Sequence, residues 1–204
     1  MCQVLDVSES GFYKRKYTAT TNSRHGLPIF ENLLQQDFKV EVPNRVWVSD
    51  ITYIATDEGW LYLATHIELC DRKVVGMAMS DNLKRDFVIK SLERAIADRK
   101  PAEGLICHSD RGVQYASEEY REMLRKYKIR GSMSRKGDCY DNAPAESFHA
   151  TIKKELIYSE RFKTRREAET KIFEYIEVFY NRQRLHSAIG YHTPHEYWEK
   201  FASA

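Results

Sequence analysis

The chain has 204 residues, of which 42% are hydrophobic and 12% aromatic, enough for one well-packed domain with an appendage but not for two large ones. Lys and Arg number 32 against 30 Asp and Glu, and this near-neutral balance argues against a polybasic or acidic disordered protein. The sequence contains no apolar run of about 18 residues that would predict a membrane span, and MCQVLDVSESGFYKRK lacks the apolar core expected of a signal peptide. Because the four cysteines are scattered without disulfide spacing, we expect a soluble, reduced, cytoplasmic protein.

The character of the sequence changes near Pro43. Residues 1–43 carry few apolar patterns, whereas residues 44–204 are dense and periodic and are expected to form the main domain. The first part of this domain holds three segments rich in β-branched and aromatic residues, separated by turns of about two to four residues. Short turns of this kind join antiparallel strands, so we predict an antiparallel meander. The predicted strands are residues 45–56, 60–70 and 73–80.

The pattern then alternates between helical and strand spacing. Apolar residues at helical intervals predict helices, and short apolar runs bounded by Gly, Pro or polar residues predict strands. The predicted fold is an α/β fold with a mixed five-stranded sheet, in which three antiparallel strands are followed by β-α alternation, flanked by helices. The elements are a helix at 84–99, a strand at 104–109, a helix at 117–128, a strand at 129–134, and helices at 144–158 and 164–181.

Three carboxylates occupy positions that suit a catalytic site. Asp50 lies in the middle of the first predicted strand, where an ionised side chain is costly unless it is paired, metal-bound or on an exposed sheet face. Asp110 directly follows the strand at 104–109, where it either serves the site or shapes the turn beside Gly112. Glu146 stands early in a predicted helix, where it could also favour the helix dipole.

Together the three residues predict a metal site. Two carboxylates from neighbouring strands and one from a helix could meet at one end of the sheet, and hard divalent cations prefer such oxygen ligands. Two such ions can clamp the attacking and leaving oxygens of a phosphoryl displacement. The sequence contains no Walker loop and no GxGxxG phosphate cradle, which makes a nucleoside-triphosphate enzyme improbable.

Five segments of the sequence carry a family resemblance. They read WVSDITYI, GWLYLA, HSDRGVQYAS, SMSRKGDCYDNAPAESF and YNRQRLHSAIGYHTPHEYW. In this order they closely resemble the orfB-type transposases of bacterial insertion sequences, which belong to the retroviral-integrase-like DDE superfamily with an RNase H-like core. The family's metal-binding triad falls on Asp50, Asp110 and Glu146, and the 35 residues between the last two match the D,D-35-E spacing.

The resemblance implies a DNA transposase or integrase core that cleaves DNA strands and transfers them to a target during transposition. It implies Mg²⁺ as cofactor, two ions held by Asp50, Asp110 and Glu146, with Mn²⁺ as a substitute. One ion would activate water or a 3′-hydroxyl, and the other would stabilise the leaving oxygen. Two alternatives stay open: a catalytically silent or inhibitory truncated copy that binds DNA, and an RNase H-like nuclease that does not join strands.

The sequence also departs from the family at several positions. Glu68 stands where these transposases often have Asp, outside the triad, and His149 stands where an aromatic residue is common. Residues 1–43 resemble the end of a helix-turn-helix region and the linker before the core, with the material between them missing. The family further implies a helix-turn-helix partner product and a homo-oligomer assembled on DNA, with no membrane partner.

Basic residues gather in the second half of the chain. Residues 121–185 contain 16 Lys and Arg against 10 Asp and Glu, as expected for a face that approaches phosphates. Lys153 follows Glu146 by two helical turns and could hold DNA beside the metal site, or be a solvated lysine. His108 shares a strand face with Asp110, and a buried structural role is favoured over a functional one. The other candidate DNA-binding residues are Arg135 and Lys136, in a Gly-containing loop, and Arg182, Arg184 and His186, which either contact DNA or favour the helix dipole.

Overall fold

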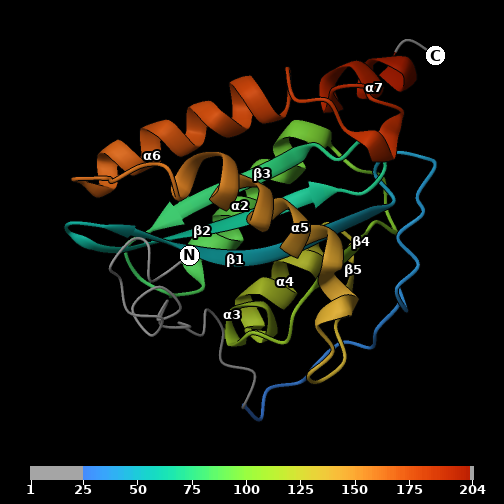
Figure 1. Cartoon of the computed structure of the whole chain (residues 1–204). Coiled ribbons are helices and arrows are strands. Elements are labelled where there is room, and N and C mark those ends of the chain that lie inside the picture. Colours follow the sequence, from blue (N-terminus) through green and yellow to red (C-terminus); the bar gives the residue numbers. More distant parts are fainter. Residues whose placement is uncertain (1–24, 203–204) are drawn as a thin grey trace, which may run out of the picture.

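A five-stranded mixed sheet forms the centre of the computed structural model, which describes residues 25–202 (Figure 1). The strand order is β3-β2-β1-β4-β5. The meander consists of β1 (Val46–Thr56), β2 (Gly59–Glu68) and β3 (Val74–Ser80), paired antiparallel. On the other side of β1, β4 (Ile106–Ser109) and β5 (Arg130–Met133) continue the sheet in parallel. The predicted fold class is thereby confirmed.

The helices lie where the periodicity predicts them, with two additions and two changes of helix type. The four-residue helix α3 and the C-terminal helix α7 were not predicted. The two long predicted helices each continue into a segment of wider π-type turns, η2 and η3. None of the helices within residues 25–202 is long and apolar enough to cross a membrane. The helices are α2 (Asp86–Arg99), α3 (Val113–Ala116), α4 (Glu118–Lys126), α5 (Ala143–Ile152), α6 (Arg165–Glu174) and α7 (Pro194–Ala202), with shorter turns η1 (Cys139–Asn142), η2 (Lys153–Ile157), η3 (Tyr175–Tyr180) and η4 (Ser187–Ile189).

The alternation of side chains along β1 divides the core into two layers. Val48 and Ile54 point into a cluster built with α5, α6 and η3. Trp47 and Ile51 point into the opposite cluster, built with α2 and α4. The period of two in a strand therefore places Asp50 on the α5 side of the sheet, with Val48 and Ile54.

The described part of the N-terminal segment lies along the core. Leu34 is buried in the same cluster as α5, and the backbone N–H of Leu33 donates to Ser132 Oγ at 2.9 Å. His25 Nε2 lies 2.8 Å from the carbonyl oxygen of Arg111. The stretch that resembles a helix-turn-helix end, MCQVLDVSESGFYKRK, falls outside the described residues.

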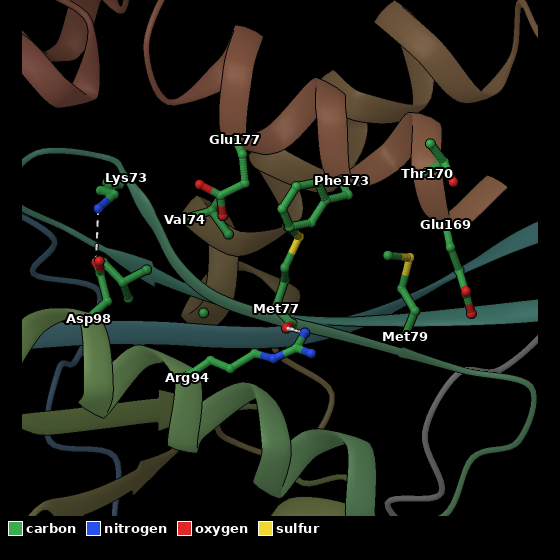
Figure 2. A pocket seen from close by; sticks show the side chains of 12 residues that line it. Lys73, Val74, Met77, Met79, Arg94, Asp98, Glu169, Thr170, Phe173 and Glu177 are labelled. Carbon is green, nitrogen blue, oxygen red and sulfur yellow. Dashed lines mark hydrogen bonds and ion pairs between the residues drawn. The ribbon is translucent and has the colours of Figure 1, made fainter. Parts of the chain in front are cut away.

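The outer edge of β3 is covered by side chains. Arg94 of α2 donates to the carbonyl oxygen of Met77 at 2.7 Å, and Figure 2 shows this contact beneath Phe173. Asn181 accepts from the N–H of Val74 at 3.0 Å and donates to its carbonyl oxygen at 3.1 Å. Because an edge strand with unpaired backbone groups invites pairing with another chain, these side chains protect the sheet edge.

Candidate active site

Asp50 and Asp110 come to the same end of two adjacent parallel strands. Val48 of β1 pairs with His108 near the end of β4, Asp50 follows Val48 by two residues within β1, and Asp110 is the first residue after β4. Asp50 Oδ1 accepts from the N–H of Ile51 at 2.8 Å, and Asp110 Oδ1 accepts from the N–H of Gly112 at 2.9 Å. Asp110 thus shapes the turn after β4 and also borders Asp50.

Glu146 lies within electrostatic reach of Asp50. It stands in the first turn of α5, which has Pro144 as its second residue and packs against β1. The pKa of Glu146 is raised by partial loss of water around its carboxyl group and by the negative charge of Asp50. The structure therefore brings α5 to the same end of the sheet as the two aspartates.

Tyr115 is a neighbour of this site that the sequence did not indicate. Its side chain is fully buried, and its pKa is raised well above the usual value by burial and by the charges of Asp50 and Asp110. The hydroxyl group therefore lies close to both aspartates. It comes from α3, the single turn that no sequence pattern predicted.

The donor set fits a hard divalent cation. All three carboxylates offer oxygen ligands, which Mg²⁺ and Mn²⁺ prefer. Within the part of the chain that the structure describes, no three His, Cys, Asp or Glu side chains are grouped tightly enough to enclose an ion. Binding an ion would therefore require the carboxylates of Asp50, Asp110 and Glu146 to move closer together.

His149 holds Asp50 in place. Its Nδ1 lies 3.2 Å from Asp50 Oδ2, and its Nε2 lies 3.1 Å from Thr65 Oγ1. The ring is 5% exposed, so these contacts are shielded from water. The sequence indicated only a packing role for this position. The sole signal was that histidine replaces the aromatic residue common in the family, because a ring nitrogen can bond a carboxylate and a phenyl ring cannot.

An ion-pair network centred on Asp141 stabilises the loop before α5. Asp141 is fully buried and accepts from Arg135 through the backbone N–H, Nε and Nη2, at 2.6, 3.0 and 2.8 Å. Asn32 and Gln36 each donate to the same carboxylate at 2.9 Å. Arg135 therefore organises the loop, while the neighbouring Lys136 is exposed.

The remaining predicted basic residues lie along α5 and after η3. Lys153 begins η2 and places its ammonium 4.9 Å from the ring centre of Tyr53. Arg184 forms a two-pronged ion pair with Glu155, from Nε at 3.0 Å and from Nη2 at 2.8 Å. Arg182 is exposed. The structure thus sets Lys153 over the ring of Tyr53 in β1 and pairs Arg184 with an acidic partner.

His108 and Glu68 are structural. His108 is fully buried between Ser132 Oγ at 2.8 Å and Ser134 Oγ at 3.2 Å, and burial lowers its pKa to about 4. Glu68 is also fully buried and accepts from the indole N–H of Trp47 at 2.9 Å. The favoured structural role of His108 is confirmed, and Glu68 lies apart from the three carboxylates.

Replacing Asp141 with asparagine is expected to destabilise the protein by about 2 kcal/mol, because a buried carboxylate loses charge-assisted bonds to Arg135. The pKa of Asp141 is lowered, chiefly by Arg135, so its contribution is present above the ordinary pKa of 3.8 and is lost as the pH falls below it. Urea unfolding at several pH values measures both effects. A difference between wild type and variant that stays constant from neutral pH down to pH values well below the ordinary pKa would contradict this account.

Comparison with known proteins identifies the family. The chain matches the family model described as "Integrase core domain" over residues 41–139, and a second model with the same description over residues 127–194. It is 49% identical over 188 residues to the "Insertion element IS600 uncharacterized 31 kDa protein" of Shigella sonnei. It is 45% identical over 186 residues to the transposase InsF for insertion sequence IS3A of Escherichia coli K12. These alignments cover 92% and 91% of this chain, and 69% and 65% of the two relatives.

Solved structures share the fold. A chain of the simian T-cell lymphotropic virus intasome, in complex with PP2A regulatory subunit B56 gamma, aligns with a TM-score of 0.63 at 16% identity, over 86% of this chain and 59% of that one. The HTLV-2 integrase catalytic core domain in complex with magnesium aligns with a TM-score of 0.58 at 16% identity, over 79% of this chain and 98% of that one. The sheet is therefore the RNase H-like sheet of retroviral integrase cores. The chain belongs to the integrase core domain family, and within it to the catalytic cores of insertion-sequence transposases.

Proposed function

We propose that this core cuts DNA at the ends of an insertion sequence and joins those ends to a target, using divalent metal ions held by Asp50, Asp110 and Glu146. The observation that carries the proposal is the parallel pairing of β1 with β4, which sets the two aspartates next to each other at the end of β4. Glu146 stands in the first turn of α5, which packs against β1, and partial burial and the charge of Asp50 both raise the pKa of Glu146.

The carboxylates of the three residues would hold Mg²⁺, two ions in the complete site, or Mn²⁺ as a substitute. Bound ions would activate the attacking water or 3′-hydroxyl and stabilise the leaving oxygen. His149 lies 3.2 Å from Asp50 and would limit the positions of this ligand while the three carboxylates close around an ion. The HTLV-2 integrase core, which shares this fold, is described in complex with magnesium, and this supports the choice of ion.

Basic side chains around the site would bind the phosphate backbone of DNA. Lys153 and Lys136 flank Glu146 on α5–η2 and on the preceding loop, and Arg182 adds an exposed charge after η3. Arg135 and Arg184 each form an ion pair with an acidic side chain, and they would bind DNA phosphate while they keep these ion pairs. Contacts of this kind position DNA and do not read its sequence.

We further propose that the core acts in the cytoplasm as a homo-oligomer on DNA, together with a helix-turn-helix product. The HTLV-2 integrase core is described in dimeric and trimeric forms, which supports self-association. The division into a segment 1–43, as a helix-turn-helix remnant and linker, and a core with its helical extension over 44–204, belongs to the same proposal.

A strand-transfer assay tests the proposal. The chain is incubated with a pre-cut, labelled insertion-sequence end, a target plasmid, and Mg²⁺ or Mn²⁺, with EDTA as the control. Metal-dependent joined products support the proposed function. Nicking without joining would favour the RNase H-like nuclease, and DNA binding without any reaction would favour the silent, inhibitory copy.

A further inference from the structure

A hollow of about 710 Å³ lies on the flank of α5 that carries Ser147 and Thr151. Its wall combines positive charge, hydroxyl groups and aromatic rings, and no Asp or Glu lines it within residues 25–202. The hollow beside β3 in Figure 2 differs, since Asp98, Glu169 and Glu177 line that one. The residues that give the α5 hollow its character are Arg72, Ser147, Thr151, Arg184, His186 and Tyr191.

Arg72 brings a cationic group to this hollow without a carboxylate partner in the described chain. Its Nε is enclosed and makes no hydrogen bond with residues 25–202. The adjacent Asp71 is instead bonded to Arg99 at 2.5 Å, and Glu68 accepts from Trp47. The negative charges of Asp71 and Glu68 act on Arg72 from nearby without forming an ion pair with it, and the guanidinium lines the hollow, where an anionic oxygen could bind it once the side chain turns outward.

Arg72 also has a strained backbone, with a φ of 64° in the turn between β2 and β3. A non-glycine residue in this region is uncommon and costs energy, and such strain gathers at functional positions. The N–H of Arg72 donates to the carbonyl oxygen of Glu68 at 3.0 Å, which holds the turn in this conformation. The guanidinium is therefore carried by a rigid turn.

His186 places a second polar atom at the hollow. Its Nε2 is enclosed and has no hydrogen-bond partner among the residues described. Burial, followed by the charges of Arg184 and Arg72, lowers the pKa of His186 to about 4, so the ring is neutral at neutral pH. Its ring packs edge-on against Tyr180, with the ring centres 4.8 Å apart. A neutral imidazole carries one N–H, and this group can donate to a phosphate oxygen when the side chain turns toward the hollow that it lines.

Tyr191 supplies an aromatic face at the rim. Its side chain is 71% exposed, and its backbone has a φ of 58°. The N–H of Tyr191 donates to the carbonyl oxygen of His186 at 2.9 Å, and the N–H of His186 donates to that of His192 at 3.0 Å. The loop thus holds a large aromatic ring out toward solvent, and its backbone is strained at this residue. An exposed ring of this kind is what base stacking requires.

We infer that this hollow binds one nucleotide of a single DNA strand, with its phosphate against Arg72 and His186 and its base stacked on Tyr191. Arginine suits phosphate by charge and geometry, and exposed aromatic rings stack any base. Ser147 lines the hollow directly after Glu146, so a strand that passes over α5 would reach both the hollow and the metal ligands. The choice of DNA as ligand rests on the proposed function.

The test measures binding of a fluorescent single-stranded oligonucleotide of about 12 nucleotides by anisotropy, at fixed salt and with EDTA present. The variants are Arg72→Gln and Tyr191→Asn; asparagine tolerates the positive φ and removes the aromatic face. The control is Lys90→Gln, which removes one charge from exposed Lys90 on α2, across the sheet. Each test variant should bind about tenfold more weakly, while the control changes by less than about twofold.

Three further measurements decide between outcomes. A blunt duplex of the same length should bind all variants about equally, and 5-iodouracil in the single strand should photo-crosslink to Tyr191. Wild-type affinity for the single strand in both test variants, with folding verified by thermal melts, overturns the inference. Arg72-dependent binding of deoxyadenosine monophosphate, without Arg72-dependent binding of the strand, overturns it in favour of a free-nucleotide site. The binding assay contains EDTA and therefore does not depend on metal ions. If strand transfer fails, the measured affinity for the single strand still decides whether the hollow binds a nucleotide.

Discussion

Replacing Asp110 with asparagine is expected to lower the rate of strand transfer by at least about 10³-fold, equivalent to about 4 kcal/mol of transition-state stabilisation. An amide keeps the size of the carboxyl group but loses the negative charge that holds a divalent cation. Asp50→Asn and Glu146→Gln should have effects of the same order, since the three residues would act on the same ions. The rate of joining of a labelled, pre-cut end in Mg²⁺ or Mn²⁺ measures this.

Thermal melts separate loss of metal binding from loss of folding. Wild-type protein should gain stability on addition of Mn²⁺, by about 2.7 kcal/mol at a concentration 100 times the dissociation constant. In EDTA, the Asp110→Asn variant and the wild type should melt at the same temperature. In Mn²⁺, the variant should gain less stability than the wild type, because Asp50 loses the carboxylate that follows the paired strand β4. Equal strand-transfer rates in Asp110→Asn and wild type would show that Asp110 is not a ligand.

Replacing Gly76 with alanine is expected to destabilise the fold by about 3 kcal/mol. A Cβ at this position of β3 would lie 2.2 Å from the carbonyl oxygen of Ser91 and 2.7 Å from the Cβ of Ala95, both on α2. The helix cannot simply shift, because Ser91 Oγ lies 2.9 Å from Nδ1 of the fully buried His66. Urea unfolding followed by circular dichroism measures the loss.

Gly26→Ala is the matched control for this change. No atom lies within 4 Å of a Cβ built at Gly26, so the same added methyl group should change stability by less than about 0.5 kcal/mol. If Gly76→Ala proved as stable as Gly26→Ala, the close approach of α2 to β3 would be wrong. The comparison therefore tests the packing of the layer that supports β2 and, through it, β1.

Periodicity alone was sufficient for much of the fold. The alternation along β1 assigned Asp50 to one face, and the structure places Val48 and Ile54 on that face with the α5 layer. Helical spacing located α2 and α6, and Thr164, the N-cap residue of α6, accepts from the N–H of Glu167 at 3.1 Å. These features depend on neighbours within a few residues, so the order of amino acids determines them directly.

Local sequence pattern was not sufficient to identify the three carboxylates as one site. Each had an ordinary alternative, and Asp110 does make the turn contact with Gly112 that its alternative required. Only the family motifs singled the three out together, and no local signal states that β4 pairs in parallel with β1. Strand register is a long-range property, set by packing of the whole sheet, so the adjacency of Asp50 and Asp110 was a hypothesis until the sheet was seen.

The chain by itself therefore determined the element types, the face of each strand, and the resemblance that identifies the family. Tertiary structure alone decided which distant residues meet: His149 with Asp50, Asn32 with the buried Asp141, and Arg72 with His186, which line the same hollow. The physical reason is one of distance along the chain. Secondary structure follows from interactions between near neighbours, whereas a site is assembled by packing, and packing depends on every layer of the fold at once.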